Sequence, residues 1–302
     1  MRLRSVELEV PGRAAAAEFL KDPWGLIDAG TRGGTTYLRG TENHAYVVSV
    51  TEAPVAAFAA ATFSGSAAEV EALFARMEAG GLPHSGWMAD FDEPGRGAGF
   101  YATGPEGEPY RFVVEREPVK ALPAQSNRPL QVSHVVFNTL DREAGSRTLV
   151  DAFGFKLSDR TRIMNFVRCD STHHAIAYAD AKKASLNHIA FEMPDLDSVM
   201  SGVGRLADAG FEPAWGPGRH GPGNNVFAYF IAPFGACIEY TAEVQRVDDS
   251  YRTGGPDDWK WPPNRNDHWG IAKRDNAKLA ASGDAFPFRA PAGVARRVAA
   301  RT

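Results

Sequence analysis

Three side chains that can bind a metal ion stand within apolar segments of the second half of the chain. His134 lies in VSHVVFN, His188 in LNHIAFEM and Glu239 in ACIEY. Burial of an unpaired carboxylate is costly unless a cation or hydrogen bonds compensate for it. Taken singly, each residue could be structural, as a satisfied strand histidine or a glutamate on an exposed strand face. Taken together, two imidazoles and one carboxylate form a facial triad that favours non-haem Fe(II), and the same ligands can bind Mn(II).

The elements that must position these residues are predicted to be strands. Side chains two residues apart lie on the same face of a strand. His134 is therefore expected to share an apolar face with Val132, and His188 with Leu186. The three candidate ligands can converge if their strands curl around one barrel-like cavity.

Internal similarity predicts that the chain is a duplication. Similar segments recur in the same order at a nearly constant separation, which is the signature of repeated structural units. The pairs are 4–10 with 132–138 and 99–112 with 227–240 at a separation of 128, and 67–80 with 197–210 at a separation of 130.

The first repeat lacks the candidate ligands. At these separations an apolar or oppositely charged residue stands wherever the second repeat has a possible ligand. We therefore expect the first half to be structural and the second half to carry the working site. The residues opposite His134, His188 and Glu239 are Val6, Phe58 and Arg111.

The order of elements predicts an α+β fold. Each half contains amphipathic helices alternating with clusters of short strands, which is typical of this class. The helix predicted over 195–210 begins with Asp195 as N-cap. We expect domains at 1–118 and 130–285, a polar linker at 119–129 and a tail at 286–302.

The overall composition is that of a globular protein with no sign of nucleic-acid or membrane binding. Of 302 residues, 44% are hydrophobic and 23% charged, and the formal net charge is −4. No basic excess suggests a nucleic-acid partner, and no apolar run is long enough to span a bilayer. With only two cysteines and no secretory signal, a cytoplasmic location is expected.

Several motifs together resemble the type I extradiol ring-cleaving dioxygenases of the vicinal oxygen chelate superfamily. The similarity extends over about residues 1–275, with its specific motifs within 130–270. It includes SHV at His134, RCDSTHHAIAY at His174, LNHIAFE at His188 and the run GRHGPGNNVFAYFIAPFGACIEY. In that run, His220, Tyr229 and Glu239 follow one another at intervals of nine and ten residues. The resemblance implies four βαβββ modules in two tandem domains, each an open barrel of paired modules, with metal only in the second.

The resemblance also implies a reaction and residue roles. A small catechol-type diol and O2 would react at Fe(II), or Mn(II), to give a muconic semialdehyde-type product. The reaction would belong to the catabolism of aromatic compounds, and a homo-oligomer is expected. His173, next to His174, is expected to be an exposed strand-edge residue. The implied ligands are His134, His188 and Glu239, the catalytic residues are His174, His220 and Tyr229, and the substrate contacts are His220, Tyr229, Asn224 and Asn225.

Some features depart from the family pattern or leave alternatives open. Asn224 and Asn225 stand where several biaryl-diol enzymes have an Asn-Asp pair, so a monocyclic, biaryl or trihydroxylated substrate remains open. The tryptophans of 259–269 could cover the cavity or only attach the C-terminal segment. Rival functions are a metal-dependent isomerase or epimerase of the same superfamily, which usually needs a second glutamate ligand, and a metal-free small-molecule binding protein.

Overall fold

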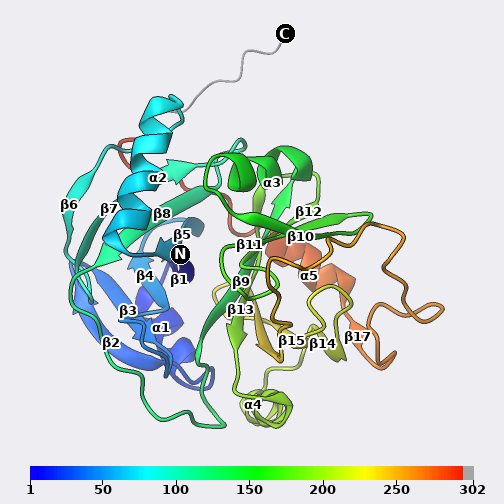
Figure 1. Ribbon diagram of the computed structural model, residues 1–302. Coiled ribbons are helices and arrows are strands. Elements are labelled where there is room, and N and C mark those ends of the chain that lie inside the picture. The colour runs from blue at the N-terminus through cyan, green and yellow to red at the C-terminus, as the bar shows by residue number, and fades with distance from the viewer. Residues whose placement is uncertain (295–302) are drawn as a thin grey trace.

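The structure, a computed structural model, describes residues 1–294 and contains two β-sheets with helices packed on them. In Figure 1 the first sheet and its helices run from blue to blue-green, and the second from green to orange. The first half contains β1 (Arg2–Val10), α1 (Arg13–Lys21), β2 (Ile27–Arg32), β3 (Thr35–Arg39), β4 (Val48–Glu52), β5 (Ala57–Ser64), α2 (Ala67–Ala79), β6 (Met88–Phe91), β7 (Gly97–Thr103) and β8 (Pro109–Glu115).

The second half repeats this order and adds a short strand and a helix. Its elements are β9 (Gln131–Thr139), α3 (Arg142–Asp151), β10 (Lys156–Arg160), β11 (Met164–Arg168), β12 (Ile176–Asp180), β13 (Ser185–Glu192), α4 (Leu196–Asp208), β14 (Trp215–Arg219), β15 (Val226–Ile231), β16 (Cys237–Ala242), β17 (Lys273–Arg274) and α5 (Asn276–Gly283).

Strand pairing confirms the predicted α+β fold of four βαβββ modules. The sheet orders are β2-β3-β4-β1-β5-β8-β7-β6 and β10-β11-β12-β9-β13-β16-β15-β14-β17. In each module the first and last strands pair in parallel, as β9 does with β12 and β13 with β16. The two modules of a half meet through antiparallel pairing of their first strands, β1 with β5 and β9 with β13. This arrangement puts three strands, β9, β13 and β16, side by side in the middle of the second sheet.

Capping and packing explain why the equivalent helices α2 and α4 form. Ser66 and Glu69 form a capping box at the start of α2. Asp195 caps α4 by accepting a hydrogen bond from the backbone N–H of Ser198, as predicted. Each helix buries one face on its sheet, and in α4 the buried Gly202 lies against the ring of Tyr240.

One hydrophobic core joins the two halves. The Trp24 ring stacks on Tyr240 of β16, with 3.8 Å between ring centroids. The Tyr240 hydroxyl donates to the Trp24 carbonyl at 2.5 Å. Farther along the interface, the hydroxyls of Tyr110 and Tyr178 are 2.5 Å apart and buried. Aromatic contacts of this kind stabilise beyond their buried area, so the second sheet is held on a rigid neighbour.

The predicted tail at 286–302 begins as an ordered segment that connects the halves. Phe286 is fully buried. Its carbonyl accepts from the Leu186 N–H at 3.0 Å, and the Phe58 N–H donates to the Pro287 carbonyl at 3.0 Å. The first residues of this segment therefore belong to the fold, because the side chains of Phe286 and Phe288 pack on both sheets. Residues 295–302 lie outside the described residues. Within residues 1–294, no helix is long and apolar enough to cross a membrane.

Candidate metal centre

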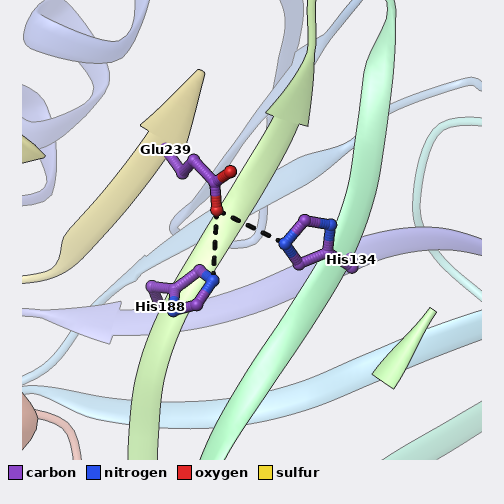
Figure 2. A group of neighbouring side chains, drawn as sticks. All are labelled: His134, His188 and Glu239. Atoms are coloured by element: carbon purple, nitrogen blue, oxygen red, sulfur yellow. Dashed lines mark ion pairs between the residues drawn. The ribbon is translucent and has the colours of Figure 1, made fainter. Parts of the chain in front are cut away.

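Three adjacent strands bring the predicted ligands together. Ala190 of β13 pairs with His134 of β9 on one side and with Glu239 of β16 on the other, while His188 lies two residues earlier on β13. The Glu239 Oε2 atom is 3.3 Å from His134 Nε2 and 3.2 Å from His188 Nε2. Figure 2 shows this oxygen facing both imidazoles. All three side chains are buried, and together they form a metal-binding triad.

Two β-bulges direct the side chains of His134 and His188 toward Glu239. Strand alternation alone did not predict these bulges. The pairing of β9 with β13 shifts register between Leu186 and His188, and again next to Val132. As a result Leu186 and Val132 lie in the main hydrophobic core, whereas His188 and His134 line the cavity. The expectation that each histidine shares a face with these residues is wrong, because a bulge turns the following side chain to the other face.

Neighbouring polar side chains hold both imidazoles in one orientation. The Ser133 Oγ atom is 3.2 Å from His134 Nδ1, and the Asn187 Oδ1 atom is 2.7 Å from His188 Nδ1. Asn187 is itself fixed by donating to Asn138 Oδ1 at 2.7 Å. A bond from Nδ1–H to Asn187 leaves Nε2 of His188 unprotonated, which a metal ligand requires. Sequence reasoning missed Ser133 and Asn187, although each directly precedes a candidate ligand.

The ligand atoms need a cation. His188 Nε2 and Glu239 Oε2 are buried and find no partner of hydrogen-bond geometry among residues 1–294. Burial alone would raise the pKa of Glu239, but the adjacent imidazoles lower it well below its usual range, and burial lowers the pKa of His188. The carboxylate is therefore ionised and the imidazole neutral. A divalent transition-metal ion fits this donor set, which leaves open positions for other ligands.

A pair formed by the buried Tyr229 and the partly buried His220 lies beside the triad. The His220 Nε2 and Tyr229 hydroxyl are 2.9 Å apart, and the Tyr229 ring is 4.8 Å from the His188 ring between centroids. Trp215 stacks on Tyr229 at 4.9 Å. Burial lowers the pKa of His220 to about 3 and raises the pKa of Tyr229 well above its usual value. Both groups are consequently neutral hydrogen-bonding groups at the cavity wall.

His174 enters the same cavity, and its neighbour does not behave as expected. The His174 ring is 4.2 Å from the His134 ring, and burial lowers the pKa of His174. His173 is fully buried, with its Nε2 2.6 Å from Asp159 Oδ2. The expectation of an exposed edge residue is wrong: β12 begins only at Ile176, so both histidines lie in the preceding loop.

The two predicted asparagines have different surroundings. Asn225 is fully buried, and its Nδ2 donates to Thr241 Oγ1 at 2.7 Å and to Glu239 Oε1 at 3.4 Å. It also lines the cavity. Asn224 is exposed, with φ of 50°, and its carbonyl accepts from Arg219. Its position therefore does not support a substrate contact, because its side chain lies outside the cavity lining.

A cavity of about 1140 Å³ opens over the metal centre. Its lining includes Trp259 and Trp261 of the C-terminal segment as well as His134, His174, His188, His220 and Tyr229. A Cβ at Gly221 would lie 3.3 Å from the Trp261 ring, so this segment packs directly on the loop after His220. Trp269 is partly exposed, under the guanidinium of Arg219. Trp259 and Trp261 therefore line the cavity and also attach the C-terminal segment to the loop after His220.

The corresponding place in the first half is filled by paired charges. Arg111 of β8 lies opposite Tyr101 of β7, as Glu239 lies opposite Tyr229. The Arg111 guanidinium contacts Glu93 at 2.8 Å and Glu7 at 2.9 Å. Burial would raise the pKa of Glu93, but Arg111 and its neighbours lower it to about 2. The buried charges compensate one another, and a metal ion is not needed there.

Comparisons with known proteins agree with this site. The profile of the glyoxalase/bleomycin resistance protein/dioxygenase superfamily matches residues 131–240. The chain is 32% identical over 122 residues to metapyrocatechase 2 of Cupriavidus necator, which covers 39% of this chain and 38% of that protein. It is 27% identical over 134 residues to the iron-dependent extradiol dioxygenase of Rhodococcus jostii (strain RHA1), covering 39% of this chain and 45% of that protein. The chain thus spans less than half the length of these relatives in each match.

A solved structure extends the similarity to the whole chain. The Mn(II)-bound glyoxalase from Novosphingobium aromaticivorans superposes with a TM-score of 0.84 at 29% identity, covering 98% of this chain and 97% of that one. The fold of that structure and the ligand set of this chain therefore agree with a metal centre at His134, His188 and Glu239. Residues 131–240, which match the profile of the glyoxalase/bleomycin resistance protein/dioxygenase superfamily, include all three ligands.

Proposed function

We propose that the protein is an extradiol dioxygenase that cleaves a catechol-type aromatic diol with O2 at Fe(II). The carbon–carbon bond next to the diol would break and both oxygen atoms would enter a muconic semialdehyde-type product. The observation that carries the proposal is the buried His134, His188 and Glu239 triad, open to an aromatic-walled cavity beside the Tyr229–His220 pair. The names of the two relatives with matching segments support it.

The metal would be held by His134, His188 and Glu239. When bound, Fe(II) supplies the Lewis acidity and redox chemistry that coupling a diol to O2 requires. Mn(II) is the alternative ion, since the same donors bind it and a similar structure contains it. The rest of the mechanism concerns groups of this chain.

Tyr229 and His220 are proposed to orient the diol. With Nε2–H of His220 donating to the phenol oxygen at 2.9 Å, the Tyr229 hydroxyl can donate its own proton to a substrate oxygen. The raised pKa of Tyr229 keeps this proton in place, so the residue acts as a fixed donor. Trp259 and Trp261 would exclude water and lie against an aromatic ring.

His174 is proposed as the acid–base residue. It is neutral because burial lowers its pKa, and it lines the cavity 4.2 Å from the ring of the ligand His134. A neutral imidazole in this place can accept a proton from the diol and return it to a developing oxyanion. Asn225, which bonds to Glu239, is proposed to hold the carboxylate as well as to border the substrate.

The test is metal loading combined with oxygen consumption. Protein purified without oxygen and reconstituted with Fe(II) is expected to contain one ion per chain, as measured by elemental analysis. With some members of a panel of monocyclic, biaryl and trihydroxylated diols, it is expected to consume O2 and form yellow products. Glu239→Gln should lose the metal, whereas the exposed Glu212→Gln should keep it. Full iron loading without oxygen uptake on any diol would refute the proposed reaction.

A second candidate is a metal-dependent isomerase, favoured by the whole-chain similarity to a structure named a glyoxalase. Such enzymes usually have a second glutamate ligand. Among the residues that the structure describes, Glu239 is the one carboxylate in the group of candidate ligands, beside two histidines. The two reactions differ in one measurable respect, since isomerisation uses no O2. Conversion of a glutathione hemithioacetal without oxygen uptake would favour the isomerase.

Location and assembly belong to the same proposal. A cytoplasmic homo-oligomer is expected for a catabolic dioxygenase that has two free cysteines. Light scattering after size exclusion would give the oligomeric state.

A further inference from the structure

A buried aspartate–histidine pair lies behind His174. The carboxylate of Asp159, on β10, is fully buried and accepts three hydrogen bonds. Its donors are His173 Nε2 at 2.6 Å, the Gly254 backbone N–H at 2.7 Å and the Tyr251 hydroxyl at 3.1 Å. A backbone N–H can only donate, so the Oδ1 atom bonded to Gly254 must accept. This fixes the orientation of the carboxylate and directs Oδ2 at His173.

The pair makes a direct contact with His174. His173 Nδ1 and His174 Nδ1 are 3.0 Å apart and both buried. Because Nε2 of His173 carries the proton that bonds to Asp159, Nδ1 of neutral His173 is an acceptor. His174 must then donate through its own Nδ1–H. Its Nε2 is left without a proton, and His174 lines the cavity above the metal centre.

We propose that Asp159 and His173 are positioning residues that fix the tautomer and ring orientation of His174, so that Nε2 of His174 is the nitrogen available to accept a proton. The proposal rests on the proposed function for the role of His174, whereas the tautomer itself follows from the contacts. Other enzymes use an aspartate in this way, and its replacement by asparagine there inverts the tautomer of the adjacent histidine.

A purely structural role for Asp159 makes a different prediction. The carboxylate also connects β10 to the segment 251–259, since a Cβ at Gly254 would meet both Asp159 Oδ1 at 2.7 Å and the Trp259 ring at 2.9 Å. If this attachment were its only purpose, loss of the charge would lower stability without changing which nitrogen of His174 carries the proton.

The first experiment measures the tautomer directly. Metal-free full-length protein labelled with ¹⁵N-histidine is studied by long-range ¹H–¹⁵N correlation, with His174 assigned from the spectrum of His174→Phe. The wild type should show His174 protonated at Nδ1. In Asp159→Asn, the Gly254 N–H should hold the amide oxygen on its side, so that the NH2 group donates to His173 Nε2. His173 would then carry its proton on Nδ1 and donate it to His174 Nδ1. His174 should consequently become protonated at Nε2. Tyr251→Phe, which leaves the Asp159–His173 bond intact, is the matched control and should resemble the wild type.

The second measurement uses the iron-loaded enzyme. Asp159→Asn is expected to lower kcat by about 10²–10⁴-fold, the range for loss of an acid–base group, while KM for the diol and the iron content change little. Tyr251→Phe should keep kcat within a few fold. Unchanged kcat and an unchanged tautomer in Asp159→Asn would overturn the proposal.

The outcomes of the two proposals can be told apart. If the wild type cleaves no diol, the proposed function fails, but the tautomer measurement still decides whether Asp159 and His173 control His174. If Asp159→Asn does not fold, the wild-type spectrum decides alone: protonation of His174 at Nε2 contradicts the hydrogen-bond chain, and protonation at Nδ1 supports it.

Discussion

At the scale of single residues, the metal centre depends on how Glu239 is kept ionised and oriented. Its Oε2 atom faces the two imidazoles, while its Oε1 atom accepts from the buried amide of Asn225. Asn225 is held in turn by Thr241 at 2.7 Å. Groups of this kind that support a ligand often matter for affinity nearly as much as the ligand itself.

Asn225→Leu should therefore weaken metal binding without removing a ligand. The leucine fills a similar volume but leaves Oε1 of Glu239 without its donor, so we expect iron affinity to fall about 10–100-fold. Titration against a competing chelator measures this change. Asn224→Gly is the control, because Asn224 is exposed and glycine tolerates its positive φ. Equal affinities for the two variants would show that Asn225 does not support Glu239.

Residue types and spacing were sufficient to predict the metal ligands, but not the groups behind them. His134, His188 and Glu239 are distinctive because each is polar within an apolar strand. The partner of His173 could not be predicted in the same way, since Asp159 lies on a different strand, β10, and the contact exists only after folding. A buried histidine therefore looked like an exposed one.

At the scale of elements, a glycine stands where each of the helices α3 and α4 approaches a tyrosine of the second sheet closely. The Cβ of an alanine at Gly202 of α4 would be 2.7 Å from the Tyr240 ring, and one at Gly145 of α3 would be 2.6 Å from the Tyr178 ring. Both rings are fully buried and also bond across the interface between the halves. The two glycines thus allow these tyrosines to lie between helix and sheet.

Two glycines of α4 should consequently respond in opposite ways to the same substitution. Gly202→Ala is expected to destabilise by about 1–3 kcal/mol, since overpacking against Tyr240 exceeds the gain in helix propensity. Gly204→Ala has no atom within 4 Å of the new Cβ and should stabilise by up to about 1 kcal/mol. Urea unfolding curves of the two variants give both signs. A stabilised Gly202→Ala would mean that the helix can move away from the sheet at little cost.

The order of elements was predictable because helical and strand periodicities recur in both halves. The bulges beside His134 and His188 were not predictable, since an extra residue in one strand is defined only by its partner strand. The same limit applied to residues 286–289, which have no strand pattern of their own and are fixed by hydrogen bonds to Phe58 and Leu186.

At the scale of the whole molecule, the two halves behave as one folding unit around a shared core. Trp24 of the first half stacks on Tyr240 of the second, and the segment after α5 bonds to both sheets. The carboxylate of Glu106, just before β8, accepts from the Leu140 N–H of the second half at 3.1 Å. The half without the metal centre therefore supports the half that has it, and buried charge at this interface affects the stability of the whole chain.

Glu108 is such a charge, and it should make stability depend on pH. Its side chain is fully buried, and its Oε1 atom finds no hydrogen-bond partner among residues 1–294. Burial raises the pKa of Glu108 from 4.5 to about 7. Between these values the folded protein keeps a proton that the unfolded chain has lost, so stability falls as pH rises and the penalty is complete above pH 7. At about 1.4 kcal/mol per pKa unit, its upper size is about 3 kcal/mol.

Glu108→Gln should remove this penalty, because the amide has no charge to bury and can still accept the Glu106 N–H that Glu108 Oε2 accepts at 2.9 Å. The difference in unfolding free energy between variant and wild type is expected to increase in favour of the variant from pH 4.5 to pH 8, by up to about 3 kcal/mol. Urea unfolding at a series of pH values measures it, and Glu212→Gln, at an exposed position, should show no such trend. A difference independent of pH would mean that Glu108 titrates in the folded protein as it does in the unfolded chain, with water or a cation compensating its charge.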